Sequence, residues 1–229
     1  KKMHKNINEL LESLNLEVNS SELYELAFTH SSFNIDAKTS HHDYERLEFV
    51  GDSVVNFVVA DLAYSKHQEM SQGDLSKLRA FIVQSSSLAE KAKKYNFNEY
   101  IRLGHSLPEN TRNTQRILED VFEAFIGAMY YDKGIDFTYN FVKNLFKDDV
   151  DHFNKNQLKD YKSELQEEMQ AEHRESVKYQ LVEELGLPHD RTFVVEVLYE
   201  DTVLGRGQGK TKKAAEQMAA LDALRKKAK

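Results

Sequence analysis

Apolar residues recur at helical spacing through the first two thirds of the chain. From residue 5 to about residue 150 they fall at intervals of three and four, with few of the alternations that mark strands. Gly73, Gly104 with Pro108, and Gly134 each follow a periodic segment, where a helix is expected to end. The pattern predicts one all-helical domain over residues 5–150.

The pattern changes beyond this domain. A polar stretch without periodicity predicts a linker over residues 151–159, and a second, smaller domain over residues 160–229. Helices are predicted at 162–170 and 212–227, and strands at 178–183, 193–199 and 202–205. An all-helical domain followed by an α-β-β-β-α domain makes the chain α+β overall.

Composition narrows the class of protein. The 229 residues, 40% of them apolar, suffice for two domains with proper cores. The sequence has no charge-free apolar stretch of about 18 residues and no secretory signal, so we expect no membrane span and a cytoplasmic location. It has no cysteine, which excludes disulfides, thiolate zinc sites and cysteine nucleophiles. The net charge is −7, yet residues 203–229 carry eight basic side chains against two acidic ones.

Five carboxylates are spaced along two largely apolar segments. Glu45, Glu48 and Asp52 recur at i, i+3 and i+7, and so fall on one face of a helix. Asp120 and Glu123 repeat the i, i+3 spacing in another apolar run. Two such helices packed face to face would gather the oxygen ligands that Mg²⁺ prefers.

The alternative interpretation of the first triplet is a solvated helix face, which is the commoner origin of an isolated acidic triplet. Here the surrounding side chains are mostly apolar and leave little of the helix for water. Gly51 in mid-helix costs ~1 kcal/mol relative to alanine, which predicts the close approach of another backbone. Crowded carboxylates repel one another unless a divalent ion offsets their charge, so we favour metal binding.

Three segments resemble bacterial ribonuclease III. Residues 45–53 are similar to the nine-residue motif of that family, with Val50 where leucine is common, and residues 120–124 are similar to its second acidic motif. Residues 27–32 are similar to its Thr-His segment, with Ser31 where arginine is common. The resemblance covers nearly the whole chain in order.

The resemblance implies specific roles. The family's metal ligands fall on Glu48, Asp52, Asp120 and Glu123; Glu123 would hold Mg²⁺ directly, and Asp52 would hold and orient the attacking water. Asp52 and Glu123 are thus the predicted catalytic residues, with Mn²⁺ as a substitute metal. The implied reaction is hydrolysis of phosphodiester bonds in double-stranded RNA to 5′-phosphate and 3′-hydroxyl ends, in RNA processing and turnover. Gln72 stands where the family usually has glutamate, so one secondary acidic position lacks a carboxylate.

Two further residues have alternatives of equal weight. The family counterpart of Glu45 acts near the substrate, but an exposed acid paired with Arg46 or a nearby lysine accounts for Glu45 as well. In the family the nuclease domain works as a homodimer whose two active sites cut the two strands of a duplex. Phe49 is a candidate for the interface plug into the partner subunit, and the alternative is a core aromatic within one chain.

Glycines and lysines precede the predicted C-terminal helix, over residues 205–213. The N-terminus of a helix presents free N–H groups and a positive dipole end, which favours phosphate. A Walker-type phosphate loop is disfavoured because its Gly-x-x-x-x-Gly-Lys-[Ser/Thr] spacing is missing from the sequence.

The α-β-β-β-α order, residues 186–189 and the lysine cluster resemble a double-stranded RNA-binding domain. By this resemblance Gln166 and Gln170 touch one minor groove and His189 the next, although a plain polar helix face is the alternative for the two glutamines. The lysines that would contact the phosphates between these grooves are Lys210, Lys212 and Lys213. Such contacts recognise A-form shape and carry little base information.

The sequence therefore predicts a Mg²⁺-dependent, homodimeric endoribonuclease for double-stranded RNA, with a tethered basic domain that concentrates the substrate. One alternative is a non-catalytic regulator that binds double-stranded RNA. The carboxylates disfavour it, because binding alone gives no reason to crowd acids near a polyanion. Another is a metal-dependent DNA nuclease, which competition between RNA and DNA duplexes would expose.

Overall fold

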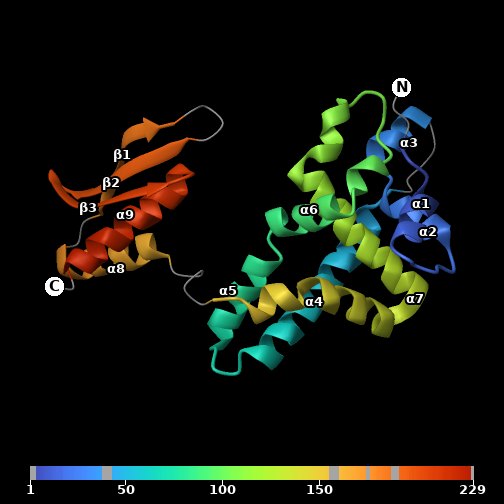
Figure 1. Ribbon diagram of the computed structural model, residues 1–229, viewed down its shortest axis with the longest axis horizontal. Coiled ribbons are helices and arrows are strands. Elements are labelled where there is room, and N and C mark those ends of the chain that lie inside the picture. The colour runs from blue at the N-terminus through green and yellow to red at the C-terminus, as the bar shows by residue number, and fades with distance from the viewer. Residues whose placement is uncertain (1–3, 38–42, 155–159, 174–175, 187–190, 228–229) are drawn as a thin grey trace. The chain divides into compact units, whose positions relative to one another are not determined.

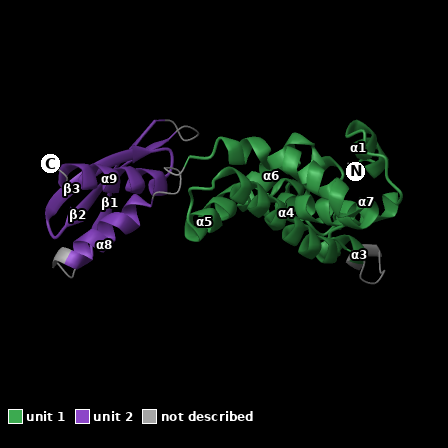
Figure 2. Ribbon diagram, turned by 90° about the horizontal axis from the view of Figure 1, so that it is seen from below, with its two compact units in different colours: residues 1–158 green, residues 159–229 purple. Residues whose placement is uncertain are grey.

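The computed structural model describes residues 4–37, 43–154, 160–173, 176–186 and 191–227. The chain forms two compact units, Lys1–Leu158 and Lys159–Lys229 (Figure 2). The first unit is helical and the second contains a sheet (Figure 1). None of the helices in the described ranges has both the length and the apolar character needed to cross a membrane.

The helical unit is built from seven α-helices and two short 3-10 turns within the described residues. They are α1 (Ile7–Ser13), α2 (Ser21–Ala27), α3 (Ser31–Ala37), α4 (Glu45–Lys66), α5 (Gln72–Ile82), α6 (Ser85–Lys94), η1 (Phe97–Glu99), η2 (Glu109–Asn113) and α7 (Gln115–Asp151). The predicted helical character is confirmed. Gly134, with φ of 79°, interrupts α7, as expected for a glycine that ends a periodic segment.

The predicted helix end at Gly73 is wrong. Gly73 lies in the first turn of α5, because Ser71 caps this helix by accepting a hydrogen bond from the backbone N–H of Asp74 at 3.2 Å. The glycine therefore follows a helix start and does not mark a helix end.

α4 and α7 form the centre of the helical unit and lie side by side (Figure 1). α4 buries four of its valines, and α7 buries every residue from Val121 to Met129. A cluster of aromatic rings joins α7 to the surrounding helices, with Phe97 and Phe125 at a centroid distance of 5.1 Å and Phe28 and Phe97 at 5.0 Å. This core fixes both helices against their neighbours.

Two glycines let the backbones of α4 and α7 touch. A Cβ atom on Gly51 would lie 1.7 Å from the carbonyl oxygen of Glu123, and one on Gly127 would lie 2.1 Å from the carbonyl oxygen of Leu47. Real atoms cannot approach so closely, so only glycine fits at either position. The prediction that the mid-helix Gly51 permits close approach by another backbone is confirmed.

The second unit pairs three antiparallel strands in the order β1-β2-β3. Its elements are α8 (Tyr161–His173), β1 (Lys178–Leu185), β2 (Thr192–Tyr199), β3 (Thr202–Gly209) and α9 (Lys212–Lys227). Leu165 and Met169 of α8 share a core with Val195 and Val197 of β2 and with the buried alanines of α9. The predicted α-β-β-β-α order, and with it the α+β fold class, is confirmed.

The predicted end of the third strand at residue 205 is wrong. β3 continues to Gly209, and its glycines face α9: a Cβ atom on Gly207 would lie 2.1 Å from the backbone nitrogen of Ala219. The glycines allow a strand to pack against the backbone of an alanine-rich helix. They do not form a phosphate loop.

Replacing Gly51 by alanine is expected to destabilise the chain by about 3 kcal/mol or more, because the added methyl group overlaps the backbone of α7. Urea denaturation measures the change. Gly73→Ala is the matched control: the nearest atom to its Cβ would be 3.9 Å away, so this substitution is expected to stabilise the chain by about 0.5 kcal/mol. Equal stability of the two variants would contradict the backbone contact.

Candidate active site

The four predicted metal ligands line one cavity of about 630 Å³ between α4 and α7. Glu48 and Asp52 come from α4, and Asp120 and Glu123 come from α7. The other lining residues are Phe49, Ser85, Arg116 and Glu119. We call this whole cavity the acidic cavity.

Local helix geometry and the glycine contact together produce this arrangement. Glu48 and Asp52 are four residues apart, and Asp120 and Glu123 three, so each pair lies on one helix face. The close contact at Gly51 is made with the backbone of Glu123 itself. The side chain of Glu123 is consequently buried, with 8% of the residue exposed.

Burial and neighbouring carboxylates raise the pKa values of two glutamates in the acidic cavity. The pKa of Glu123 is raised from 4.5 to about 8, mainly by burial and then by the charges of Asp52, Glu119, Glu48 and Asp120 in that order. The pKa of Glu48 is raised to about 7, again mainly by burial, with Asp120 and Glu45 acting in the same direction and Arg116 against them. Burial and the neighbouring carboxylates thus both disfavour the charged forms of Glu48 and Glu123.

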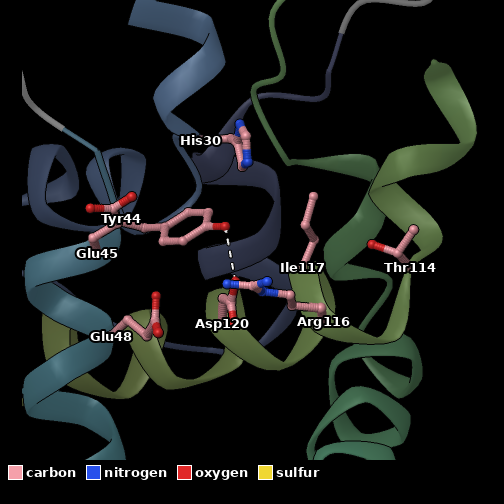
Figure 3. Close-up of a pocket in the computed structure, with 8 residues that line it drawn as sticks. All are labelled: His30, Tyr44, Glu45, Glu48, Thr114, Arg116, Ile117 and Asp120. Atoms are coloured by element: carbon pink, nitrogen blue, oxygen red, sulfur yellow. Dashed lines mark hydrogen bonds and ion pairs between the residues drawn. The ribbon is translucent and has the colours of Figure 1, made fainter. Parts of the chain in front are cut away.

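Asp120 is a milder case. Burial raises its pKa, while the hydrogen bond from Tyr44 and the charge of Arg116 oppose that shift. The hydroxyl of Tyr44 donates to Oδ2 of Asp120 at 3.2 Å, and Figure 3 shows the phenol directed at the carboxylate (Figure 3). Nε of Arg116 lies 4.0 Å from the same oxygen. The hydrogen bond from Tyr44 and the charge of Arg116 therefore both favour the charged form of Asp120.

The donor set suits a hard divalent cation. All four side chains offer carboxylate oxygens, the ligands that Mg²⁺ and Mn²⁺ prefer. In the described part of the chain no three acidic or histidine side chains already converge as a coordination sphere. A bound cation would offset the mutual repulsion of the carboxylates. The residues of the acidic cavity therefore fit Mg²⁺.

Sequence reasoning missed two residues that hold the carboxylates. Nδ2 of Asn56 donates to Oδ1 of Asp52 at 2.7 Å, and its position four residues after Asp52 was a usable signal. Tyr44 is 76 positions from Asp120, so only the fold brings them together. Tyr44 and His30 line a second cavity of about 510 Å³, the tyrosine cavity, which shares Glu48, Arg116 and Asp120 with the acidic cavity (Figure 3).

The structure also locates the two residues with open alternatives. Glu45 is exposed and lines the tyrosine cavity beside Glu48 and Asp120. Phe49 is 76% exposed, so the alternative of a core aromatic within one chain is wrong. Phe49 instead borders an apolar cavity of about 630 Å³ together with Tyr131, which is 60% exposed.

The predicted RNA contacts of the second unit lie on α8 and near the start of α9. Gln166 and Lys213 line one cavity of about 770 Å³. Nε2 of Gln166 is buried without a hydrogen-bond partner in the part of the chain that the structure describes. Gln170 is exposed, and His189 lies outside the described residues. The exposed lysines near the start of α9 are Lys210, Lys212 and Lys213.

Comparison with known proteins identifies both units. Residues 20–149 match the model of the family described as Ribonuclease-III-like, and residues 161–227 match the Double-stranded RNA binding motif. Ribonuclease 3 of Bacillus cytotoxicus is 41% identical, over 94% of this chain and 89% of the relative. Ribonuclease 3 of Borreliella afzelii is 39% identical, over 96% of this chain and 90% of the relative.

A solved structure agrees with the sequence relatives. The nuclease domain of ribonuclease III from Campylobacter jejuni is 34% identical with a TM-score of 0.57, covering 62% of this chain and 97% of that chain. The chain belongs to the ribonuclease III family. It is an endoribonuclease for double-stranded RNA, which confirms the predicted enzyme class and disfavours the non-catalytic regulator.

The raised pKa of Glu123 makes a stability prediction. Between pH 4.5 and about 8 the folded chain retains a proton that the unfolded chain releases, so the stability of the folded chain falls as the pH rises through this window. Glu123→Gln removes this penalty. With chelator present at about pH 8.5, we expect the variant to be more stable than the native chain by about 1 kcal/mol or more.

Urea denaturation at several pH values measures this gain, which should shrink towards pH 4.5. Glu12→Gln, at an exposed glutamate of α1, is the control and should show no comparable gain. A Glu123→Gln variant without extra stability at alkaline pH would contradict the electrostatic account of the acidic cavity.

Proposed function

We propose that the chain cleaves double-stranded RNA by Mg²⁺-dependent phosphodiester hydrolysis. The observation that carries this proposal is the acidic cavity, in which burial and mutual repulsion raise the pKa of Glu48 to about 7 and that of Glu123 to about 8. Four carboxylates that line one partly buried cavity favour a divalent cation, and a cation beside an RNA backbone supports phosphodiester hydrolysis.

Each carboxylate has a part in this proposal. Glu48, Asp52, Asp120 and Glu123 would hold the cation. Asp52, whose Oδ1 accepts from the amide of Asn56 at 2.7 Å, would also orient the attacking water. When bound, Mg²⁺ supplies an activated water and stabilises the departing 3′ oxygen, so the products carry 5′-phosphate and 3′-hydroxyl ends.

The second unit would deliver the substrate. The exposed lysines near the start of α9 offer positive charge for phosphates. On α8, Gln170 offers an exposed amide for a minor groove, and Gln166, whose Nε2 is buried, is proposed for the same groove on the resemblance. His189 is proposed for the neighbouring minor groove on the resemblance alone. Because such contacts recognise A-form shape and carry little base information, the proposed substrates are double-stranded RNAs in general. We propose processing of ribosomal and messenger RNA in the cytoplasm on the family resemblance alone.

We further propose that the helical unit works as a homodimer with one active site for each strand. Phe49 and Tyr131 are large apolar side chains left exposed beside an apolar cavity, an arrangement that favours a protein interface. The Campylobacter jejuni nuclease domain is described as having structural flexibility in a region involved in dimer formation. Two catalytic cavities in one dimer would cut the two strands of a duplex.

Cleavage of a long labelled RNA duplex tests the proposal. The native chain is expected to cut with Mg²⁺ and to stop with chelator, and Glu123→Gln is expected to slow cleavage by about 100-fold or more because a ligand is lost. Gel shifts should show that Glu123→Gln still binds the duplex, since the proposed RNA contacts lie in the other unit. Gln170→Ala should instead weaken binding.

The outcomes separate the alternatives. Binding without cleavage by the native chain at every Mg²⁺ concentration would contradict the proposal, as would cleavage that resists chelator. Equal competition by RNA and DNA duplexes would favour the DNA nuclease.

A further inference from the structure

Tyr44 connects the two helices that carry the carboxylates. The residue is buried, with 4% exposed, and its backbone immediately precedes α4. Its hydroxyl donates to Oδ2 of Asp120 on α7 at 3.2 Å (Figure 3). Within the described ranges Tyr44 is the one hydrogen-bond donor to this carboxylate, since Nε of Arg116 stands 4.0 Å away on a side chain that is 89% exposed. The orientation of Asp120 thus depends on the phenol.

The phenol is itself held from several sides. The backbone N–H of Tyr44 donates to the carbonyl oxygen of Thr29 at 3.0 Å. Its carbonyl oxygen accepts from the backbone N–H groups of Leu47 and Glu48, both at 2.9 Å, and so starts the helix that carries Glu48. The ring of His30 packs against the ring of Tyr44 edge to face, with centroids 5.7 Å apart. The hydroxyl group is therefore presented in a fixed direction.

The chemistry of this contact suits a carboxylate that must bind a cation. A phenol donates one hydrogen bond, which occupies part of Oδ2 and leaves the other oxygen of Asp120 able to accept. Carboxylates that bind metals are commonly held by such hydrogen bonds, and loss of the outer partner typically lowers metal affinity by about 10- to 100-fold. The buried tyrosine matches this role.

We propose that Tyr44 is a positioning residue that fixes the Asp120 carboxylate for divalent-cation binding, and so sets the Mg²⁺ concentration at which the enzyme works. This inference rests on the proposed function, in which Asp120 is a ligand. It assigns Tyr44 no direct contact with RNA or metal.

Tyr44→Phe tests the inference, because it keeps the ring and removes only the hydroxyl. Isothermal titration of Mg²⁺ into the full chain should show a dissociation constant about 10-fold or more above that of the native chain. The Mg²⁺ concentration for half-maximal cleavage should rise in parallel, cleavage should recover at saturating Mg²⁺, and duplex binding in gel shifts should not change.

The chain offers a matched control in Tyr24→Phe. Tyr24 is also buried, and its hydroxyl donates to Oδ2 of Asp132 at the same distance of 3.2 Å, outside the acidic cavity. This variant should lose a comparable hydrogen bond and some thermal stability, yet bind Mg²⁺ like the native chain.

Three results would overturn the inference. Native Mg²⁺ affinity in Tyr44→Phe would show that the hydroxyl only stabilises the fold, and the proposed function would stand if the native chain still needed Mg²⁺. Equal losses of Mg²⁺ affinity in Tyr44→Phe and Tyr24→Phe would point to general loosening of the helices. A native chain that neither binds nor needs Mg²⁺ would remove the proposed function, and this inference with it.

Discussion

The contact between the backbones of α4 and α7 is the constraint on which the site depends. Gly51 and Gly127 remove the two side-chain atoms that would otherwise separate the helices. The helices then approach closely enough for four carboxylates, two from each, to line one cavity. A wider spacing would leave the same residues as two unrelated acidic faces, so two residues without side chains determine what the charged residues can do.

This arrangement is costly in the absence of a cation. The pKa values of Glu48 and Glu123 are raised because burial and neighbouring carboxylates disfavour their charged forms. The packing of the rest of the helical unit offsets that cost. It includes aromatic rings on α7, such as Phe146, rings that pack against α7, such as Phe28, and buried valines along α4. Stability supplied by the core is thus used to hold the proposed cation site, a common relation between stability and function.

Much of this structure was predictable from local sequence patterns. Helical periodicity indicated the helical unit, β-branched and aromatic residues indicated the order of strands, and the spacing of five carboxylates indicated the faces on which they lie. These features depend on neighbours a few positions apart, which is why one sequence suffices. Gly51 was informative for the same reason. Its sequence neighbours predict an apolar helix, in which a glycine is costly unless another backbone packs closely against it.

The errors arose where distant segments decide the outcome. The third strand was predicted to end at residue 205. It continues because its later glycines pack against the alanines of α9, a partner that a local pattern does not show. Gly73 was predicted to end a helix because it follows an apolar-periodic segment. The cap from Ser71 instead starts α5 there, and this cap outweighs the cost of a glycine in the first turn. Tyr44 was overlooked because its partner Asp120 is 76 positions away, and the exposure of Phe49 depends on the packing of the whole unit.

The central claim is that α4 and α7 build one cation site together, and a double-mutant cycle of Mg²⁺ affinity tests it most directly. Glu48→Gln removes a carboxylate from α4, Glu123→Gln removes one from α7, and calorimetry compares both with the double variant. If the carboxylates share one ion, each single substitution weakens binding and the double variant loses less than the sum of the two. Additive losses, or Mg²⁺ affinity that neither substitution changes, would contradict the account.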